Sequence, residues 1–334
     1  MNTEFLSTHT PELFAAAVQR AADLLRHGAV VALPTETVYG LAANALDESA
    51  VSKIFQIKGR PAHNPLIVHV ASRAMAAACV TSFPEMAEKL SRAFWPGPLT
   101  LVLPRAHLIP TNVTAGGGTV AIRWPAHPFI QAVIRECDFP LAAPSANLSN
   151  RISPTNAGHV RAQLDGKIPL IVDGGQSQVG IESTVLDLSA KPPVILRPGM
   201  IHAESLAAIV SAMSVPRDQR PGALRSPGQL PKHYSPKAKL WIWDWKNETA
   251  LAGRIKALGL DPATVHILAH TRIPNGEAFA GVSVIPHDAE AFARALYAEL
   301  HRCDDAGVQN IFVEQPPDSP EWAGILDRLR RAAA

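Results

Sequence analysis

Hydrophobic positions in the first two hundred residues recur with two periods, one typical of helices and one typical of strands. Residues 11–27 carry apolar side chains at helical spacing and stop at Gly28, which predicts an amphipathic helix. The run 29–33 is apolar, contains β-branched residues and is closed by Pro34, so it predicts a buried strand.

The same two patterns continue along the chain. Further strands are predicted at 65–70, 99–103, 119–123, 141–143, 168–173, 184–188 and 194–196, and further helices at 48–57, 84–94, 127–137, 154–164 and near 203–213. Alternating strands and helices indicate a layered α/β domain. The irregular spacing of the strands favours a mixed sheet.

The character of the chain changes at residue 214. The segment 214–238 has little periodicity and holds five prolines, Pro216, Pro221, Pro227, Pro231 and Pro236, so we expect an interdomain linker. Beyond it, strands are predicted at 239–245, 265–271, 282–286 and 311–314, and helices at 248–258, 289–303 and 320–333. This βαβ alternation predicts a smaller parallel-sheet domain over 239–334, after a first domain over 1–213.

Composition excludes several classes of protein. The 334 residues are 47% hydrophobic, and 31 Lys and Arg against 29 Asp and Glu leave a formal charge of +2, too little for a protein that coats duplex nucleic acid. Cys79, Cys137 and Cys303 lie far apart, which fits neither a disulfide framework nor a cysteine-rich zinc site. We find no signal-peptide pattern and no apolar stretch of the roughly 20 residues that a bilayer helix needs. We therefore expect a cytoplasmic protein.

The common catalytic signatures are missing. The chain contains no GxGxxG, GxxxxGK[ST], HExxH or GxSxG. Gly116, Gly117 and Gly118 precede a predicted strand and have no lysine after them, which favours a flexible turn over a phosphate loop.

Polar residues gather where the predicted strands end. Residues 34–40 follow the first strand, and hydroxyl groups in such a place commonly cap the next helix, although a cap alone does not need the whole string. Lys58 and Arg60 lie in a Gly/Pro-rich turn that we expect to be exposed. A mobile point charge beside a planar guanidinium suits a polyphosphate or a carboxylate, and a solvated basic turn is the alternative.

Three later segments have similar chemistry. Residues 144–147 and 149–153 offer small hydroxyl and amide groups, which either bind phosphate and sugar oxygens or form local turns. Residues 173–184 predict a turn between strands, and Arg197 again follows a strand. Together these loops indicate a ligand site at strand ends, where α/β sheets usually bind ligands.

Seven strings in this order resemble one family. They are PTETVYGL, KGRPAHNPLIVH, WPGPLT, VAIRWPAHP, APSAN, DGGQSQVGIESTV and ILRPG. The chain is similar over residues 24–200 to the YrdC-like threonylcarbamoyl-adenylate synthases, and residues 226–236 resemble the linker of the long, two-domain form of that family. The resemblance implies a YrdC-like α/β domain with a twisted mixed sheet and flanking helices, followed by a smaller Rossmann-like parallel α/β domain. That second domain is matched only in its architecture, so no function is carried onto it.

The resemblance implies an activity. In this family L-threonine, bicarbonate or CO2, and ATP become threonylcarbamoyl-AMP and pyrophosphate, the first step of tRNA threonylcarbamoyladenosine (t6A) formation. Such chemistry needs proximity, charge neutralisation and exclusion of water, and it needs no nucleophilic Ser or Cys. We expect Mg2+ to arrive on the phosphates of ATP and no metal to be held by the protein. The downstream tRNA threonylcarbamoyl transferase machinery is an expected partner, and contact with tRNA should be weak or indirect.

The resemblance also implies which residues form the site. The catalytic set around the triphosphate is Lys58, Arg60, Ser145 and Asn147. The remaining nucleotide-binding residues are Asn64, Thr119, Ala143, Ser153, Arg197 and, from the linker, Tyr234. L-threonine is held by Thr35, His69, Arg123 and Ser183, with Arg123 pairing with its carboxylate in a bidentate manner.

Two other functions remain as alternatives. A basic concave face could bind RNA without turning over ATP, although the near-neutral charge and the absence of interleaved aromatic residues argue against it. The same domain also occurs in a larger carbamoylating maturation factor, which should carry zinc-finger cysteine pairs that three isolated cysteines cannot make.

Overall fold

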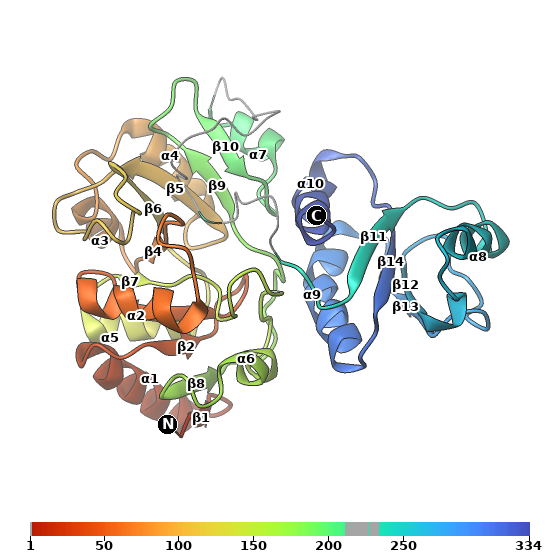
Figure 1. The fold of residues 1–334 in the computed structure, drawn as a ribbon. Coiled ribbons are helices and arrows are strands. Elements are labelled where there is room, and N and C mark those ends of the chain that lie inside the picture. The colour runs from red at the N-terminus through yellow and green to blue at the C-terminus, as the bar shows by residue number, and fades with distance from the viewer. Residues whose placement is uncertain (1, 211–226, 228–233) are drawn as a thin grey trace. The chain divides into compact units, whose positions relative to one another are not determined.

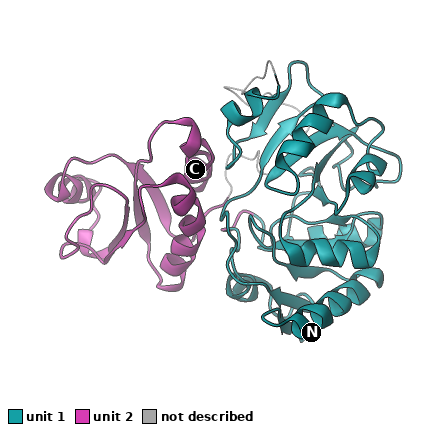
Figure 2. Cartoon of the chain, turned by 180° about the vertical axis from the view of Figure 1, so that it is seen from behind, with its two compact units in different colours: residues 1–149, 153–229 teal, residues 150–152, 230–334 magenta. Residues whose placement is uncertain are grey.

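The computed structural model describes residues 2–210, 227 and 234–334 (Figure 1). It separates into two compact units, which Figure 2 colours separately. The first comprises Met1–Ser149 and Ser153–Gln229, and the second comprises Asn150–Ile152 and Leu230–Ala334. Each unit is an α/β structure, as the sequence predicts.

The first unit contains ten described strands. They are β1 (Glu4–Ser7), β2 (Val31–Leu33), β3 (Gly40–Asn44), β4 (Ile67–His69), β5 (Leu99–Pro104), β6 (Thr119–Arg123), β7 (Leu141–Ala142), β8 (Leu170–Asp173), β9 (Thr184–Asp187) and β10 (Val194–Arg197). They form one sheet in the order β1-β8-β2-β3-β7-β4-β6-β5-β9-β10. The sheet is mixed: β4 and β6 are parallel, for example, whereas β5 and β6 are antiparallel.

The described helices of the first unit connect these strands. They are α1 (Pro11–Arg26), α2 (Glu48–Lys58), α3 (Arg73–Ala78), α4 (Glu85–Phe94), α5 (Pro128–Cys137), α6 (Ala157–Leu164) and α7 (Ala203–Ala207). Side-chain caps begin several of them: Thr10 accepts from the backbone N–H of Leu13, and Asp47 accepts from Ser49 and Ala50. No helix among the described residues has the length and apolar character needed to span a membrane.

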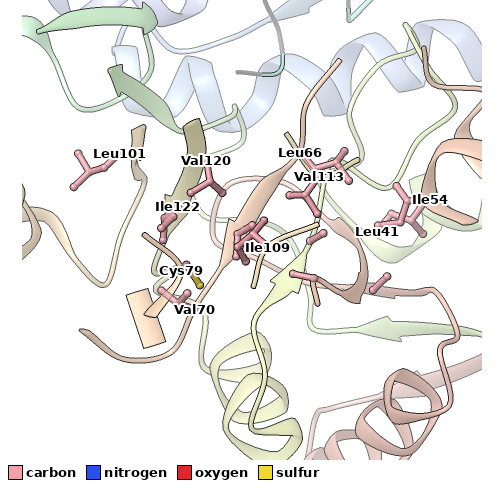
Figure 3. Close-up of a cluster of buried hydrophobic side chains, with 14 of the residues drawn as sticks. Leu41, Ile54, Leu66, Val70, Cys79, Leu101, Ile109, Val113, Val120 and Ile122 are labelled. Atoms are coloured by element: carbon pink, nitrogen blue, oxygen red, sulfur yellow. The ribbon is translucent and has the colours of Figure 1, made fainter. Parts of the chain in front are cut away.

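One face of the sheet carries the main hydrophobic core. Alternate residues of β5 and β6, such as Leu101 and Ile122, are register partners and point into this core (Figure 3). Apolar residues of α2, α3, α4, α6 and α7 complete the cluster. Helices thus cover this face.

The opposite face is covered by helices over only part of its width. Around β2, β3 and β8 it packs against α1 and α5, through residues such as Leu25 and Phe129. Around β4, β6, β5 and β9 the buried apolar residues are Ile67, Val102, Ala121 and Val185, with Leu196 of β10 partly buried against them. All of these come from strands, and no described helix contributes to the cluster. This helix-free part of the sheet is called the site face below.

Three elements of the first unit were not predicted from the sequence. β1 is a four-residue strand that pairs with β8, α3 is a short helix capped by Ser72, and β3 follows residues 34–39. The expectation that the hydroxyl groups of 34–40 cap a helix is wrong, because the next element is β3. Its sequence, GLAAN, lacks β-branched residues and is held by antiparallel pairing with β2.

The second unit holds a parallel sheet, as predicted. Its strands are β11 (Lys239–Trp243), β12 (Val265–Ala269), β13 (Gly281–Val284) and β14 (Asn310–Glu314), in the order β11-β14-β12-β13. Every pair is parallel. Its helices are α8 (Glu248–Ala257), α9 (Ala289–Asp305) and α10 (Ala323–Ala332), with 3-10 turns η1 (Pro262–Thr264) and η2 (Pro320–Trp322).

Most of the predicted linker, 214–238, lies outside the described residues, as does the end of the helix expected near 203–213. The boundaries 1–213, 214–238 and 239–334 therefore stay a prediction.

Candidate active site

Register places several of the family residues on the site face. His69 is the last residue of β4 and pairs with Arg123, the last residue of β6. Because side chains alternate along a strand, Thr119, Ala121 and Arg123 share one face, and Ala121 belongs to the apolar cluster there. Polar residues therefore border a small apolar floor, as in many small-molecule sites.

Arg123 is the centre of one group of polar residues. Its side chain is only 4% exposed. The guanidinium donates from Nε to the Gly97 carbonyl at 3.2 Å and from Nη1 to Thr37 Oγ1 at 2.8 Å. Nη2 lies 2.7 Å from Glu36 Oε1 as an ion pair. A guanidinium has five N–H donors, so these two hydrogen bonds leave capacity for a ligand.

His69 is buried beside this cation. Its Nδ1 lies 3.3 Å from the Ile67 carbonyl, which favours a proton on Nδ1 and leaves the Nε2 lone pair available. Burial, followed by the positive charge of Arg123, lowers the pKa of His69 to about 3. The imidazole is therefore neutral at physiological pH and can accept a hydrogen bond from a substrate.

Thr35 shapes the loop that carries Glu36 and Thr37. Its Oγ1 donates to the Val38 carbonyl at 2.6 Å, accepts from the N–H groups of Thr37 and Val38, and lies 3.0 Å from Thr37 Oγ1. Since Thr37 also accepts from Arg123, this network joins the loop to the end of β6.

Ser183 and Arg197 form a second pair. Arg197 Nη2 donates to Ser183 Oγ at 3.1 Å and its Nε donates to the Ser183 carbonyl at 3.0 Å. Ser183 Oγ also lies 2.8 Å from Thr100 Oγ1. Both site residues are almost fully buried, and the contact brings together one member of the threonine set and one of the nucleotide set.

Lys58 is the last residue of α2, and its side chain is 3% exposed. Its Nζ donates to the carbonyls of Ser145 and Asn147 at 2.6 and 2.5 Å. Burial, and next the charge of Arg60, hold the pKa of Lys58 well below the usual value of a lysine. An anion placed beside this ammonium would reverse that effect.

Arg60 follows Gly59, which caps α2 in the left-handed region with φ of 60°. The Arg60 side chain donates to Asn64 Oδ1 and to the Pro65 carbonyl, both at 2.7 Å. Asn64 is fully buried, and its Nδ2 has no hydrogen-bond partner among the described residues. Lys58 and Arg60 are therefore not in an exposed turn, contrary to the expectation from the sequence, because the cap turns the chain inward.

The remaining nucleotide-set residues lie in the same unit. Asn147 lies beside Lys58, and Ser145 forms a bridge with Gly40 at the start of β3. The Ala143 N–H donates to the Ile67 carbonyl at 3.1 Å, next to the site face. Ser153 Oγ donates to Glu182 Oε1 at 2.5 Å, and Thr119 begins β6.

Tyr234 belongs to the second unit. It is 1% exposed, its ring centroid lies 6.0 Å from that of Tyr297, and Arg328 Cζ lies 5.4 Å from the same ring. These two contacts are with residues of the second unit, and the role of Tyr234 at the nucleotide stays a prediction.

Sequence reasoning missed the partners that hold these residues. Glu36, Thr37, Thr100 and Glu182 each contact a member of the family sets. Glu36 and Thr37 lie within the string 34–40. This string is longer than a helix cap needs, and that extra length was the one sign in the sequence that these two residues have another role.

Known proteins resemble this chain over nearly its whole length. A family model of the Sua5, YciO and YrdC proteins, described as "Telomere recombination", matches residues 23–199, and one described as "Threonylcarbamoyl-AMP synthase, C-terminal domain" matches 201–334. The threonylcarbamoyl-AMP synthase of Bacillus subtilis is 42% identical over 99% of this chain and 95% of its own length. That of Pyrococcus abyssi is 38% identical over 95% and 94%. The crystal structure of P. abyssi Sua5 complexed with L-threonine superposes with a TM-score of 0.90 at 36% identity, covering 100% of this chain and 98% of the other.

Proposed function

The chain belongs to the family of threonylcarbamoyl-AMP synthases, and from this membership we propose which of its residues bind each substrate. It is a nucleotidyltransferase that acts on L-threonine and ATP and serves the t6A modification of tRNA. The carbon source, the metal, the later partners and the residue roles below are proposals.

Threonine binds to Thr35, His69, Arg123 and Ser183. The observation that carries this proposal is the convergence on Arg123, which pairs in register with His69 and hydrogen-bonds to Thr37 beside Thr35. The N–H groups of Arg123 that are not used by Gly97, Thr37 and Glu36 bind the substrate carboxylate. The neutral His69 accepts a hydrogen bond from the hydroxyl or the amine.

ATP binds to Lys58, Arg60, Asn64, Thr119, Ala143, Ser145, Asn147, Ser153 and Arg197, and Tyr234 is a further proposed nucleotide-binding residue. Lys58 Nζ donates to the carbonyls of Ser145 and Asn147 at 2.6 and 2.5 Å and makes only a long contact, 3.5 Å, with Asn147 Oδ1, which a phosphate oxygen would replace. The unpartnered Asn64 Nδ2 offers another donor after a small rearrangement. The contact of Ser183 with Arg197 makes the two subsites adjacent.

The chemistry follows from this adjacency. The neutral amine of threonine bonds to the carbon of CO2 and releases a proton, or bonds to the carbon of bicarbonate with loss of water, and either route gives a carbamate. A carbamate oxygen then attacks the α-phosphorus of ATP, and the bond to the pyrophosphate oxygen breaks. Lys58 and Arg60, with Ser145 and Asn147, stabilise the negative charge of the triphosphate. The burial of Lys58, Arg60 and Asn147 limits the access of water to the carbamate.

Mg2+ travels on the phosphates of ATP. Among the described residues, no three His, Cys, Asp or Glu side chains are grouped as metal ligands, and Mg2+ commonly binds through substrate phosphates. We further propose that the product passes to the tRNA threonylcarbamoyl transferase machinery in the cytoplasm, with weak or indirect contact to tRNA.

Isotope labelling tests this proposal. The full chain is incubated with ATP, Mg2+, L-threonine and 13C-bicarbonate, and the products are separated for mass spectrometry. We expect threonylcarbamoyl-AMP that carries the label. Unlabelled product, or a threonyl adenylate without the additional carbon, would contradict the proposed carbon source.

A further inference from the structure

Glu36 forms a buried ion pair with Arg123, the cation proposed above to bind the substrate carboxylate. The Glu36 side chain is about nine-tenths buried, and its Oε1 lies 2.7 Å from Arg123 Nη2 and accepts from the Ala126 N–H at 2.9 Å. The carboxylate thus ties the loop after β2 to the segment that follows β6. It fixes the position of the guanidinium.

The carboxyl group is ionised in spite of its burial. Burial, the largest influence, raises its pKa, but the charge of Arg123 and the hydrogen bond from Ala126 outweigh it, so that the pKa lies below the usual value. His69 contributes no charge nearby at neutral pH, because its pKa is about 3. The Glu36 and Arg123 pair is therefore electrically neutral.

Stability does not explain such a pair well. Removing two charges from water costs about as much as their attraction returns, so an apolar pair of the same size could replace them. Glu36 Oε2 is buried without a hydrogen-bond partner among the described residues, which makes the arrangement more costly. A functional reason for the negative charge is therefore needed.

Charge complementarity supplies one. Free threonine at neutral pH is a zwitterion, with a carboxylate that is attracted to Arg123 and an ammonium that is attracted to Glu36. A carboxylic acid without the amine meets the repulsion of Glu36 and gains nothing in return. With Glu36 uncharged, Arg123 would instead favour the simple carboxylate and repel the ammonium.

We infer that Glu36 is a specificity-determining residue, which positions Arg123 and cancels its charge so that the subsite selects a zwitterionic amino acid over a carboxylic acid without an amine. This inference rests on the proposed placement of the threonine carboxylate at Arg123. Glu36 acts through Arg123, because its free oxygen is enclosed by protein, so it is a positioning residue and not a catalytic one.

Binding calorimetry on the full chain tests the inference. The ligands are L-threonine and (R)-3-hydroxybutanoate, which is the same molecule without the amine. The variants are Glu36→Gln, which removes the charge and keeps an acceptor for Ala126, and Glu36→Asp, which keeps the charge. Glu48→Gln, at the exposed start of α2, is the control with the same change in net charge.

The ratio of the two affinities is the decisive quantity. We expect Glu36→Gln to lower the preference for threonine by about tenfold or more, as removal of one partner of a buried charge pair does. The KM for threonine should rise while the KM for ATP stays unchanged. Glu36→Asp should recover part of the preference, and Glu48→Gln should retain all of it.

Two results would overturn the inference. If Glu36→Gln and Glu36→Asp weaken both ligands in parallel, Glu36 has only a structural role. If the wild-type chain binds hydroxybutanoate as tightly as threonine, no selection for the amine exists. Failure of the wild-type chain to bind threonine at all would instead refute the proposed threonine subsite, from which the inference starts.

Discussion

The ammonium of Lys58 donates a hydrogen bond to the backbone carbonyl of Asn147, 89 residues further along the chain. This contact brings the end of α2 to the segment that follows β7, and it joins the two halves of the set proposed to hold the triphosphate. The pKa of Lys58 is lowered by burial, and its side chain faces small polar groups. Such an arrangement is typical of a site that binds an anion.

Replacement of Lys58 should therefore abolish pyrophosphate release. Loss of one charged contact to the transition state costs about 2–4 kcal/mol, or about 30- to 900-fold in rate. Because Lys58 is buried, we choose Lys58→Met, which keeps the apolar stem. The control is Lys53→Ala, since the Lys53 ammonium also bonds to a backbone carbonyl, that of Gly28, but at the surface. Near-normal turnover in Lys58→Met would refute the assignment.

Binding of ATP should be accompanied by uptake of protons at Lys58. In the free protein burial and Arg60 lower the pKa of this lysine, and phosphate charges would raise it. At any pH between the two values, a proton is taken up on binding. Calorimetry in buffers of different ionisation enthalpy measures this uptake, which should be absent from Lys58→Met. Equal uptake by both proteins would show that another group titrates.

His69 should make the first unit less stable in mild acid. Its pKa is about 3 in the folded protein against about 6.5 in an unfolded chain, so between these values the unfolded state binds more protons. Stability is fully present above pH 6.5 and is lost as the pH falls toward 3, by at most about 1.4 kcal/mol per pH unit. The fall in unfolding free energy from pH 7 to 4.5 should be smaller in His69→Gln. Identical pH slopes would contradict the prediction.

Tyr234 requires a milder substitution than alanine. It is among the largest fully buried side chains, so Tyr234→Ala would leave a cavity and lower stability. Tyr234→Phe removes only the hydroxyl. If Tyr234 contacts the nucleotide through that group, this variant weakens ATP binding and melts as the wild type does. Unchanged ATP affinity would restrict the hydroxyl to the interior of the second unit.

Strands with an apolar or β-branched run of residues could be predicted from the sequence. Strands that form only because neighbouring strands pair with them could not. The β-branched or apolar runs of β2, β5 and β6 coincide with predicted strands. β3 is built from Gly, Leu, Ala and Asn, and it exists because β2 and β7 pair with it on either side.

The site shows the same division. Cations and hydroxyl groups at the ends of predicted strands indicated a ligand site, and the resemblance to the family implied which residues form it. The burial of Lys58 and Arg60 could not be predicted from the sequence. Lys58 is held by the carbonyls of Ser145 and Asn147, and Arg60 is held by Asn64. The role of Glu36 likewise depends on Arg123, and the neighbouring contact from Arg123 to Thr37 spans 86 residues.

A survey of amino acids in one assay tests the synthase activity of the chain. The full chain is incubated with ATP, Mg2+, bicarbonate and each amino acid in turn, and pyrophosphate release is measured. We expect release with threonine, weaker release with serine by about 1–3 kcal/mol for the missing methyl, and little with valine, which lacks the hydroxyl. Equal release with valine and threonine, or release that does not depend on an amino acid, would contradict the account.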